Sequence, residues 1–344
     1  MVLDGSCKPF RKEIELLLKI FSMLSPGTED LPCTIKVTAD VEKDYNLLSP
    51  GGDKAQDGLR RLKDLNGVLV PSASENPSFT ILISEQQFAD LQYVHTLAHE
   101  LVHLYDYSRF FKENGNLNLR GREEQEKAHY SEFCFWAEFH AKRVGTWFQC
   151  FYSWYGEHGL ETPPDGRCSF SIDWQTKSVQ EALDRFTAGR TSALANDLLW
   201  DLVLALVCYY GRLSLDEATG WDSIPDPAFP KEGLVAALGE PVLDLFTLLK
   251  RMRFYEEAVP LLPSLDGLFG KIAAKLNSGS PWWFPRPDFI DQITTVQAQM
   301  RKTIESLTQG LAANDFLKAY SDVFRALKLD KSASRDEDAD KTKR

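Results

Sequence analysis

The chain has 344 residues, enough for two domains, and its 43% hydrophobic and 26% charged residues suit a globular protein with a core of normal size. Its 50 acidic residues outnumber 39 basic ones, and the formal net charge of −11 argues against a broad nucleic-acid-binding surface. Six cysteines without a Cys-x-x-Cys pair argue against a disulfide scaffold and against a zinc site built from cysteines. We therefore expect reduced thiols in a cytoplasmic protein.

The first part of the chain predicts one helix and then short strands. Apolar residues recur with helical spacing over residues 14–21, and the N-terminus lacks the basic and apolar regions of a signal peptide. Three segments rich in β-branched residues predict strands, namely 33–40 (CTIKVTAD), 67–72 (GVLVPS) and 78–84 (SFTILIS). Apolar residues alternate in the last segment, which predicts a strand with one face buried.

Two long helices are predicted next. Ser84 begins the pattern Ser-Glu-Gln-Gln, a capping box with Gln87 at the third helical position, so we expect a helix from there to about Tyr107. A polar segment then leads to a helix near residues 129–152.

Only helical periodicity follows a turn-rich boundary at residues 160–170. The most apolar run, LLWDLVLALVCYY at 198–210, is too short to span a bilayer and contains Asp201, so we expect a buried helix and no membrane partner. The last residues are charged and predict a disordered tail. The sequence thus predicts an α+β region at 1–160 with a small sheet, an all-α region at 161–330, and a tail at 331–344.

The first long helix carries the stretch LAHELVHLYDY. His99 and His103 stand four residues apart, so both imidazoles project from one face and can share a Zn²⁺ ion at about 2.0–2.1 Å. Glu100 is rotated by about 100° from His99 and can instead hold a water molecule and take its proton. The alternative is a pair of buried histidines hydrogen-bonded to their neighbours.

A catalytic zinc has three protein ligands and one open position. The next predicted helix offers four candidates for the third ligand, which are His129, Glu132, Glu138 and His140. His95 lies one turn before His99 on the same stripe, but a third ligand from one straight helix would be badly placed. We expect His95 to pack or to support a ligand.

This order of a strand, a His-Glu-x-x-His helix and a later helix resembles the zincin metallopeptidases whose third ligand is a downstream glutamate. It is similar to the ImmA/IrrE-type peptidases, where that glutamate stands in a Glu-x-x-Ala setting. Here Glu138 precedes Ala141 in this way, with 34 residues between His103 and Glu138. The resemblance implies a zincin-like catalytic domain at 1–160 with Zn²⁺ held by His99, His103 and Glu138.

The same motifs also resemble the mitochondrial inner-membrane peptidase family that processes an ATP synthase subunit, although its shorter gap and extra cysteines are not matched. Lys142 stands where thermolysin-like peptidases have the aspartate that orients a ligand histidine. Asp106, three residues after His103, is the candidate for that role, and its alternative is a solvated acid near a helix end. The donor to the reacting carbonyl oxygen stays open among four residues, which are Tyr105, Tyr107, Tyr130 and His140.

The sequence therefore predicts a zinc metalloendopeptidase that hydrolyses a protein or peptide substrate through a metal-activated water, with Glu100 as the catalytic base. The alternative is a zincin-like regulatory or partner-binding protein with little or no turnover. The strand at 78–84 lies either at the edge of the cleft, where an extended substrate could pair with it, or inside the sheet. No sequence feature indicates the oligomeric state.

Overall fold

The computed structural model describes residues 1–25, 27, 30–48, 66–89, 92–158, 172–191, 195–219 and 229–274. Four strands form one mixed sheet in the order β1-β2-β4-β3. Their bounds are β1 Val2–Leu3, β2 Cys33–Thr38, β3 Gly67–Pro71 and β4 Phe79–Ser84. The first three strands in this order are parallel, and β3 is antiparallel to β4. The three predicted strands are confirmed, and the two-residue β1 was not predicted.

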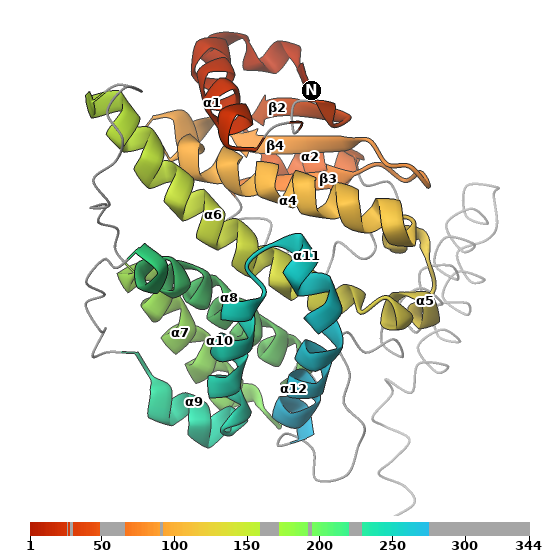
Figure 1. Ribbon diagram of the computed structural model, residues 1–344, viewed down its shortest axis with the longest axis vertical. Helices are drawn as coiled ribbons and strands as arrows, with labels where there is room; N and C mark the ends of the chain where they lie inside the picture. Colours follow the sequence, from red (N-terminus) through yellow and green to blue (C-terminus); the bar gives the residue numbers. More distant parts are fainter. Residues whose placement is uncertain are drawn as a thin grey trace, which may run out of the picture. The chain divides into compact units, whose positions relative to one another are not determined.

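Most of the described chain is helical (Figure 1), as listed by these bounds: η1 Gly5–Phe10, α1 Arg11–Leu24, α2 Val41–Leu48, η4 Glu85–Phe88, α4 Tyr93–Asn114, η5 Leu117–Leu119, α5 Arg122–Lys127, α6 Tyr130–His158, α7 Asp173–Gly189, α8 Ala195–Thr219, α9 Lys231–Leu238, α10 Pro241–Arg251, α11 Tyr255–Ala258, η6 Val259–Leu261 and α12 Leu262–Ala274. The predicted α+β class is thereby confirmed. The boundary predicted at 160–170 and the tail predicted at 331–344 lie outside the described residues.

Strand β4 is buried on both faces. Ile81 and Ile83 belong to the main core, which also contains residues of α1 and α4, whereas Leu82 packs on the opposite face with Val41 of α2. Because β2 and β4 pair on one side and β3 and β4 on the other, β4 is an interior strand. Among the described strands, β3 ends the sheet on this side, and it contacts α4.

The first long helix begins later than predicted. Residues after Ser84 form the short 3₁₀ helix η4, and the Ser84 side chain makes no capping hydrogen bond. Gln87 instead accepts a hydrogen bond of 3.1 Å from Thr96 of α4. The capping-box prediction is therefore wrong, because the glutamine finds a partner in the next element rather than at the start of its own. The helix α4 begins at Tyr93 and continues beyond Tyr107 to Asn114.

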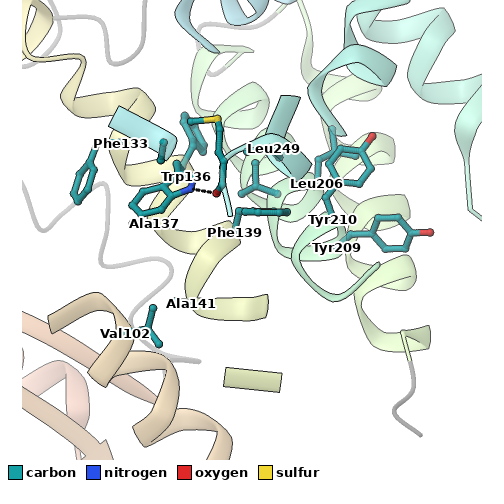
Figure 2. Close-up of a cluster of buried hydrophobic side chains, with 14 of the residues drawn as sticks. Val102, Phe133, Trp136, Ala137, Phe139, Ala141, Leu206, Tyr209, Tyr210 and Leu249 are labelled. Carbon is teal, nitrogen blue, oxygen red and sulfur yellow. Dashed lines mark hydrogen bonds between the residues drawn. The ribbon is translucent and has the colours of Figure 1, made fainter. Parts of the chain in front are cut away.

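Helix α6 lies between α4 and α8 and contacts both. Its buried aromatic residues Phe133, Trp136 and Phe139 belong to one core cluster with residues of α8 and α10, such as Leu206 (Figure 2). The Trp136 indole also donates a hydrogen bond of 2.7 Å to the carbonyl of Met252. The metal-site candidates on α6 thus stand on a helix that is fixed on both sides.

The apolar run predicted as a buried helix lies in α8. A window in it, Asp197–Leu215, is long and apolar enough to cross a membrane by length and composition, with a mean hydropathy of 1.5. More than half of that window, 56%, is buried inside the protein, as in the core helix of a globular domain.

Four of the cysteines, Cys7, Cys33, Cys134 and Cys208, are free thiols. Cys150 is disulfide-bonded, so the expectation of reduced thiols does not hold there.

Candidate metal centre

Polar side chains recur at every fourth residue on the facing sides of α4 and α6, so that each helix presents a stripe. The stripe of α4 consists of His95, His99, His103 and Tyr107. The stripe of α6 consists of Cys134, Glu138 and Lys142. The chain runs in opposite directions along the two stripes, so the end of one meets the start of the other. Tyr107 Oη donates to Cys134 Sγ at 3.4 Å, and His95 Nε2 lies 3.5 Å from Lys142 Nζ.

His99, His103 and Glu138 meet at the middle of this seam. The Nε2 atoms of His99 and His103 lie 3.0 Å apart, and Glu138 places Oε2 at 3.5 Å from the first and Oε1 at 3.4 Å from the second. In a tetrahedron with metal bonds of about 2.0–2.1 Å, the ligand atoms are separated by about 3.3 Å. One ligand atom from each residue lies within 4.8 Å of the others, so the group could hold a metal ion. The nitrogen–nitrogen–oxygen donor set suits Zn²⁺.

The helices approach closely at this point because α6 has a glycine there. A Cβ on Gly145 would lie 3.3 Å from the backbone nitrogen of His99, too close for most side chains. The two histidine side chains are nearly buried, with exposed fractions of 10% and 7%, while the Glu138 side chain is 34% exposed. The candidate centre is therefore enclosed by protein around the two histidines and open to solvent at Glu138.

The two histidines differ in protonation. Burial, with the charge of His103 next in importance, lowers the pKa of His99 to about 4, so this ring is neutral near pH 7. Burial by itself would lower the pKa of His103, but the charge and hydrogen bond of Glu138, together with the charges of Glu100 and Asp106, outweigh burial and raise that pKa above its ordinary value. Burial would likewise raise the pKa of Glu138, yet His103 holds it well below the usual range. His103 and Glu138 thus form an ion pair, and a divalent cation that binds both residues would displace the proton of His103.

The Glu100 side chain is buried beside the two histidines. Burial raises the pKa of its carboxyl group to about 7, partly offset by the charge of His103. The edge strand β3 runs directly beside it: a Cβ on Gly67 would lie 3.5 Å from Glu100 Cγ and only 2.5 Å from Thr96 Cγ2. Glu100 is therefore enclosed between α4 and β3, next to the two histidines but outside the group that converges on one point.

Asp106 does not take the contact predicted for it. The residue is completely buried, and its Oδ2 lies 2.7 Å from Nδ1 of His140 on α6 rather than against a ring nitrogen of His99 or His103. Three residues after His103, Asp106 is rotated by about 60° from it around the helix, toward α6. It acts on His103 through its charge, which contributes to the raised pKa of that ring. Its hydrogen bond fixes α4 to α6.

The alternative third ligands lie elsewhere. His140 is engaged by Asp106 and stacks on Trp136 with ring centroids 5.0 Å apart. Glu132 is buried away from the seam, where burial and the charge of Asp266 raise its pKa to about 7. His129 lies 3.9 Å from Glu132. Within the described part of the chain, Glu138 alone completes a group of three with His99 and His103.

The candidates for the oxyanion donor take different positions in the structure. Tyr107 lies next to the centre, with its ring 5.9 Å from that of His103. Tyr105 accepts a hydrogen bond from Arg109, and Tyr130 donates one to Asn118. Lys142, which stands where thermolysin-like peptidases have an aspartate, follows Glu138 by four residues. This spacing, which the sequence already contains, places it on the same stripe of α6.

Comparisons with known proteins add no relative: no family model, no curated protein and no solved structure matches the chain.

Proposed function

We propose that the protein is a zinc-dependent metallopeptidase of the zincin type, in which His99, His103 and Glu138 hold Zn²⁺. The observation that supports this most strongly is the convergence of these side chains. The Nε2 atoms of His99 and His103 lie 3.0 Å apart, and the two carboxylate oxygens of Glu138 lie 3.5 Å and 3.4 Å from them, close to the spacing of tetrahedral zinc ligands. Three protein ligands leave the fourth position that a catalytic zinc requires. The order of His-Glu-x-x-His and Glu-x-x-Ala on successive long helices, similar to ImmA/IrrE-type peptidases, supports the same proposal.

A zinc ion at this centre would supply Lewis acidity and lower the pKa of a water molecule bound to it. Glu100 then accepts the proton of the attacking water and passes it to the leaving amine. Burial raises the pKa of Glu100 to about 7, and a divalent cation beside it would favour the ionised carboxylate that accepts a proton. Its burial between α4 and β3 fixes the carboxylate in one place.

The edge of the sheet supports a peptide as the substrate. Among the described strands, β3 pairs only with β4, and it lies against Glu100. An extended peptide can pair with the backbone of such an edge, which presents its scissile bond in a defined direction. The substrate edge proposed here is thus β3 rather than the strand directly before the motif helix.

The test combines zinc analysis with mapping of newly formed protein termini. We expect about one zinc per chain in the wild type, and loss of zinc in His103→Ala. Glu100→Gln keeps the zinc but abolishes the new termini that the wild type produces. Glu132→Gln, which removes a buried carboxylate of α6 outside the centre, is the matched control and keeps both. If Glu100→Gln binds zinc and leaves every cleavage unchanged, the peptidase function is refuted and a regulatory role replaces it.

A further inference from the structure

Lys142 presents a positive charge beside the proposed metal centre. It follows Glu138 by one helical turn on the same side of α6, and its Nζ lies 3.5 Å from Nε2 of His95. Its charge contributes to lowering the pKa values of His99 and Glu100, so the ammonium lies near enough to the centre to influence both groups electrostatically. Burial lowers the pKa of His95 well below its ordinary value, so the neighbour of Lys142 is a neutral ring.

The base of the Lys142 side chain is fixed by α8. A Cβ on Gly211 would lie 2.9 Å from Lys142 Cβ and 2.7 Å from the carbonyl oxygen of Phe139, so α8 and α6 are in close contact here. Arg212, the next residue of α8, adds a second positive charge near His95. Within the described residues, no carboxylate lies within ion-pair distance of the Lys142 ammonium, whose recorded polar contact is His95. A lysine held against a buried neutral ring is placed to receive an anion from outside the protein.

From its position, the Lys142 ammonium would contact a substrate group near the reacting bond rather than the reacting carbonyl oxygen itself. The rings of His95 and His99 are 6.0 Å apart, so the contact of Lys142 lies about one helical turn from the ligand atoms. A donor to the developing oxyanion must approach to about 2.7–3.1 Å. An extended peptide advances by about 3.3 Å per residue, so a distance of this size corresponds to one or two residues.

We propose that Lys142 binds a carboxylate of the substrate, so that the enzyme acts on peptides with a negative charge within one or two residues of the bond that it cleaves. This inference rests on the proposed peptidase function. The carboxylate can belong to the C-terminus of the peptide or to an acidic side chain. Both present the same chemistry to the ammonium.

The test measures binding without turnover. Zinc-loaded Glu100→Gln protein is titrated by calorimetry with three probes: N-acetyl-tetra-alanine as the free acid, the same peptide as its C-terminal amide, and an amide of equal length that ends in aspartate. We expect the free acid or the aspartate peptide to bind about tenfold more tightly than the neutral amide. Which of the two gains affinity identifies the source of the carboxylate.

Three further variants in the Glu100→Gln background assign the effect to Lys142. Lys142→Met removes the preference for the charged probe, Lys142→Arg keeps most of it, and each must retain zinc and its circular dichroism spectrum. Arg143→Met loses the same charge one residue further along α6, where the guanidinium faces the carbonyl of Arg253, and keeps the full preference. Equal affinity of charged and neutral probes, absence of binding by the charged probes, or a preference that survives Lys142→Met overturns the inference. Absence of peptidase activity in the wild type would refute the proposed function alone, because binding is measured separately.

Discussion

At the scale of single residues, the centre combines groups whose surroundings drive their protonation in opposite directions. His99 is kept neutral by burial, while His103 and Glu138 stabilise each other's charges. A zinc ligand must be a neutral imidazole or a carboxylate, so two of the three groups are ready for the metal and His103 must lose a proton.

Zinc affinity should therefore depend on pH with a defined sign. Below the raised pKa of His103, zinc must displace one proton, so the apparent dissociation constant rises about tenfold for each unit by which the pH falls. Above that pKa the affinity levels off. Competition with a chromophoric chelator across the range in which imidazole titrates measures the curve. Glu100→Gln, which keeps the three ligands and removes one of the charges that raise the pKa of His103, shifts the bend to lower pH. A flat curve in the wild type would contradict the assignment.

Glu132 gives a second prediction, this one about stability. Its pKa is raised to about 7 by burial, so the folded state binds the proton more tightly than the unfolded state does. The stability that this proton confers is complete below the ordinary carboxyl pKa and is lost as the pH rises through about 7. Glu132→Gln should thus be more stable than the wild type at alkaline pH by about 3 kcal/mol, and no more stable in acid. Urea unfolding at several pH values measures this.

The exposed Glu123 provides the control for that experiment, since Glu123→Gln should change the unfolding free energy little at any pH. An equal gain in both variants would show that net charge, rather than burial of Glu132, is responsible.

At the scale of the elements, the sequence predicts what depends on local spacing. The strands and the helical positions of His99, His103 and Glu138 follow from periodicity and motif, and the structure brings these three residues together. The capping box at Ser84 was wrong because Gln87 bonds to Thr96, a contact that arises only when η4 folds back on α4. The partner of Asp106 was equally out of reach, since His140 stands 34 residues later.

The contact between β3 and α4 gives a prediction for one glycine. In Gly67→Ala, the new methyl group would stand 2.5 Å from Thr96 Cγ2, so either the Thr96 side chain or β3 must shift. We expect a loss of about 1–3 kcal/mol in the free energy of unfolding. Thr96→Ser removes that methyl group and keeps the hydroxyl that donates to Gln87.

The double variant Gly67→Ala/Thr96→Ser should therefore recover most of the lost stability in urea unfolding, as in a double-mutant cycle. Strictly additive losses would place the clash elsewhere, for example at the carbonyl of Leu82, 3.2 Å from the same position.

At the scale of the whole molecule, the candidate metal centre and the later helices share α6. One face of this helix carries Glu138, while Trp136 and Phe139 belong to the core that includes α8 and α10. The segment after α10 is tied to α4 as well, since Arg109 pairs with Glu256 at 2.6 Å and Tyr255 donates to Glu113 at 2.9 Å. The predicted division into a catalytic and a helical domain would have to pass through this shared core.

Disturbing α8 should consequently weaken the binding of zinc at the proposed centre. Leu206 is fully buried in the core shown in Figure 2, and Leu206→Ala should cost about 2–5 kcal/mol of unfolding free energy. Because α6 links α8 to the centre, the temperature at which zinc is released should fall together with the unfolding transition, as followed by a zinc dye and by circular dichroism in one scan. Trp174→Ala truncates a side chain of α7 that is 69% exposed and should leave both temperatures unchanged. Zinc release that stays at the wild-type temperature while helical signal is lost earlier would show that the two regions unfold as separate domains.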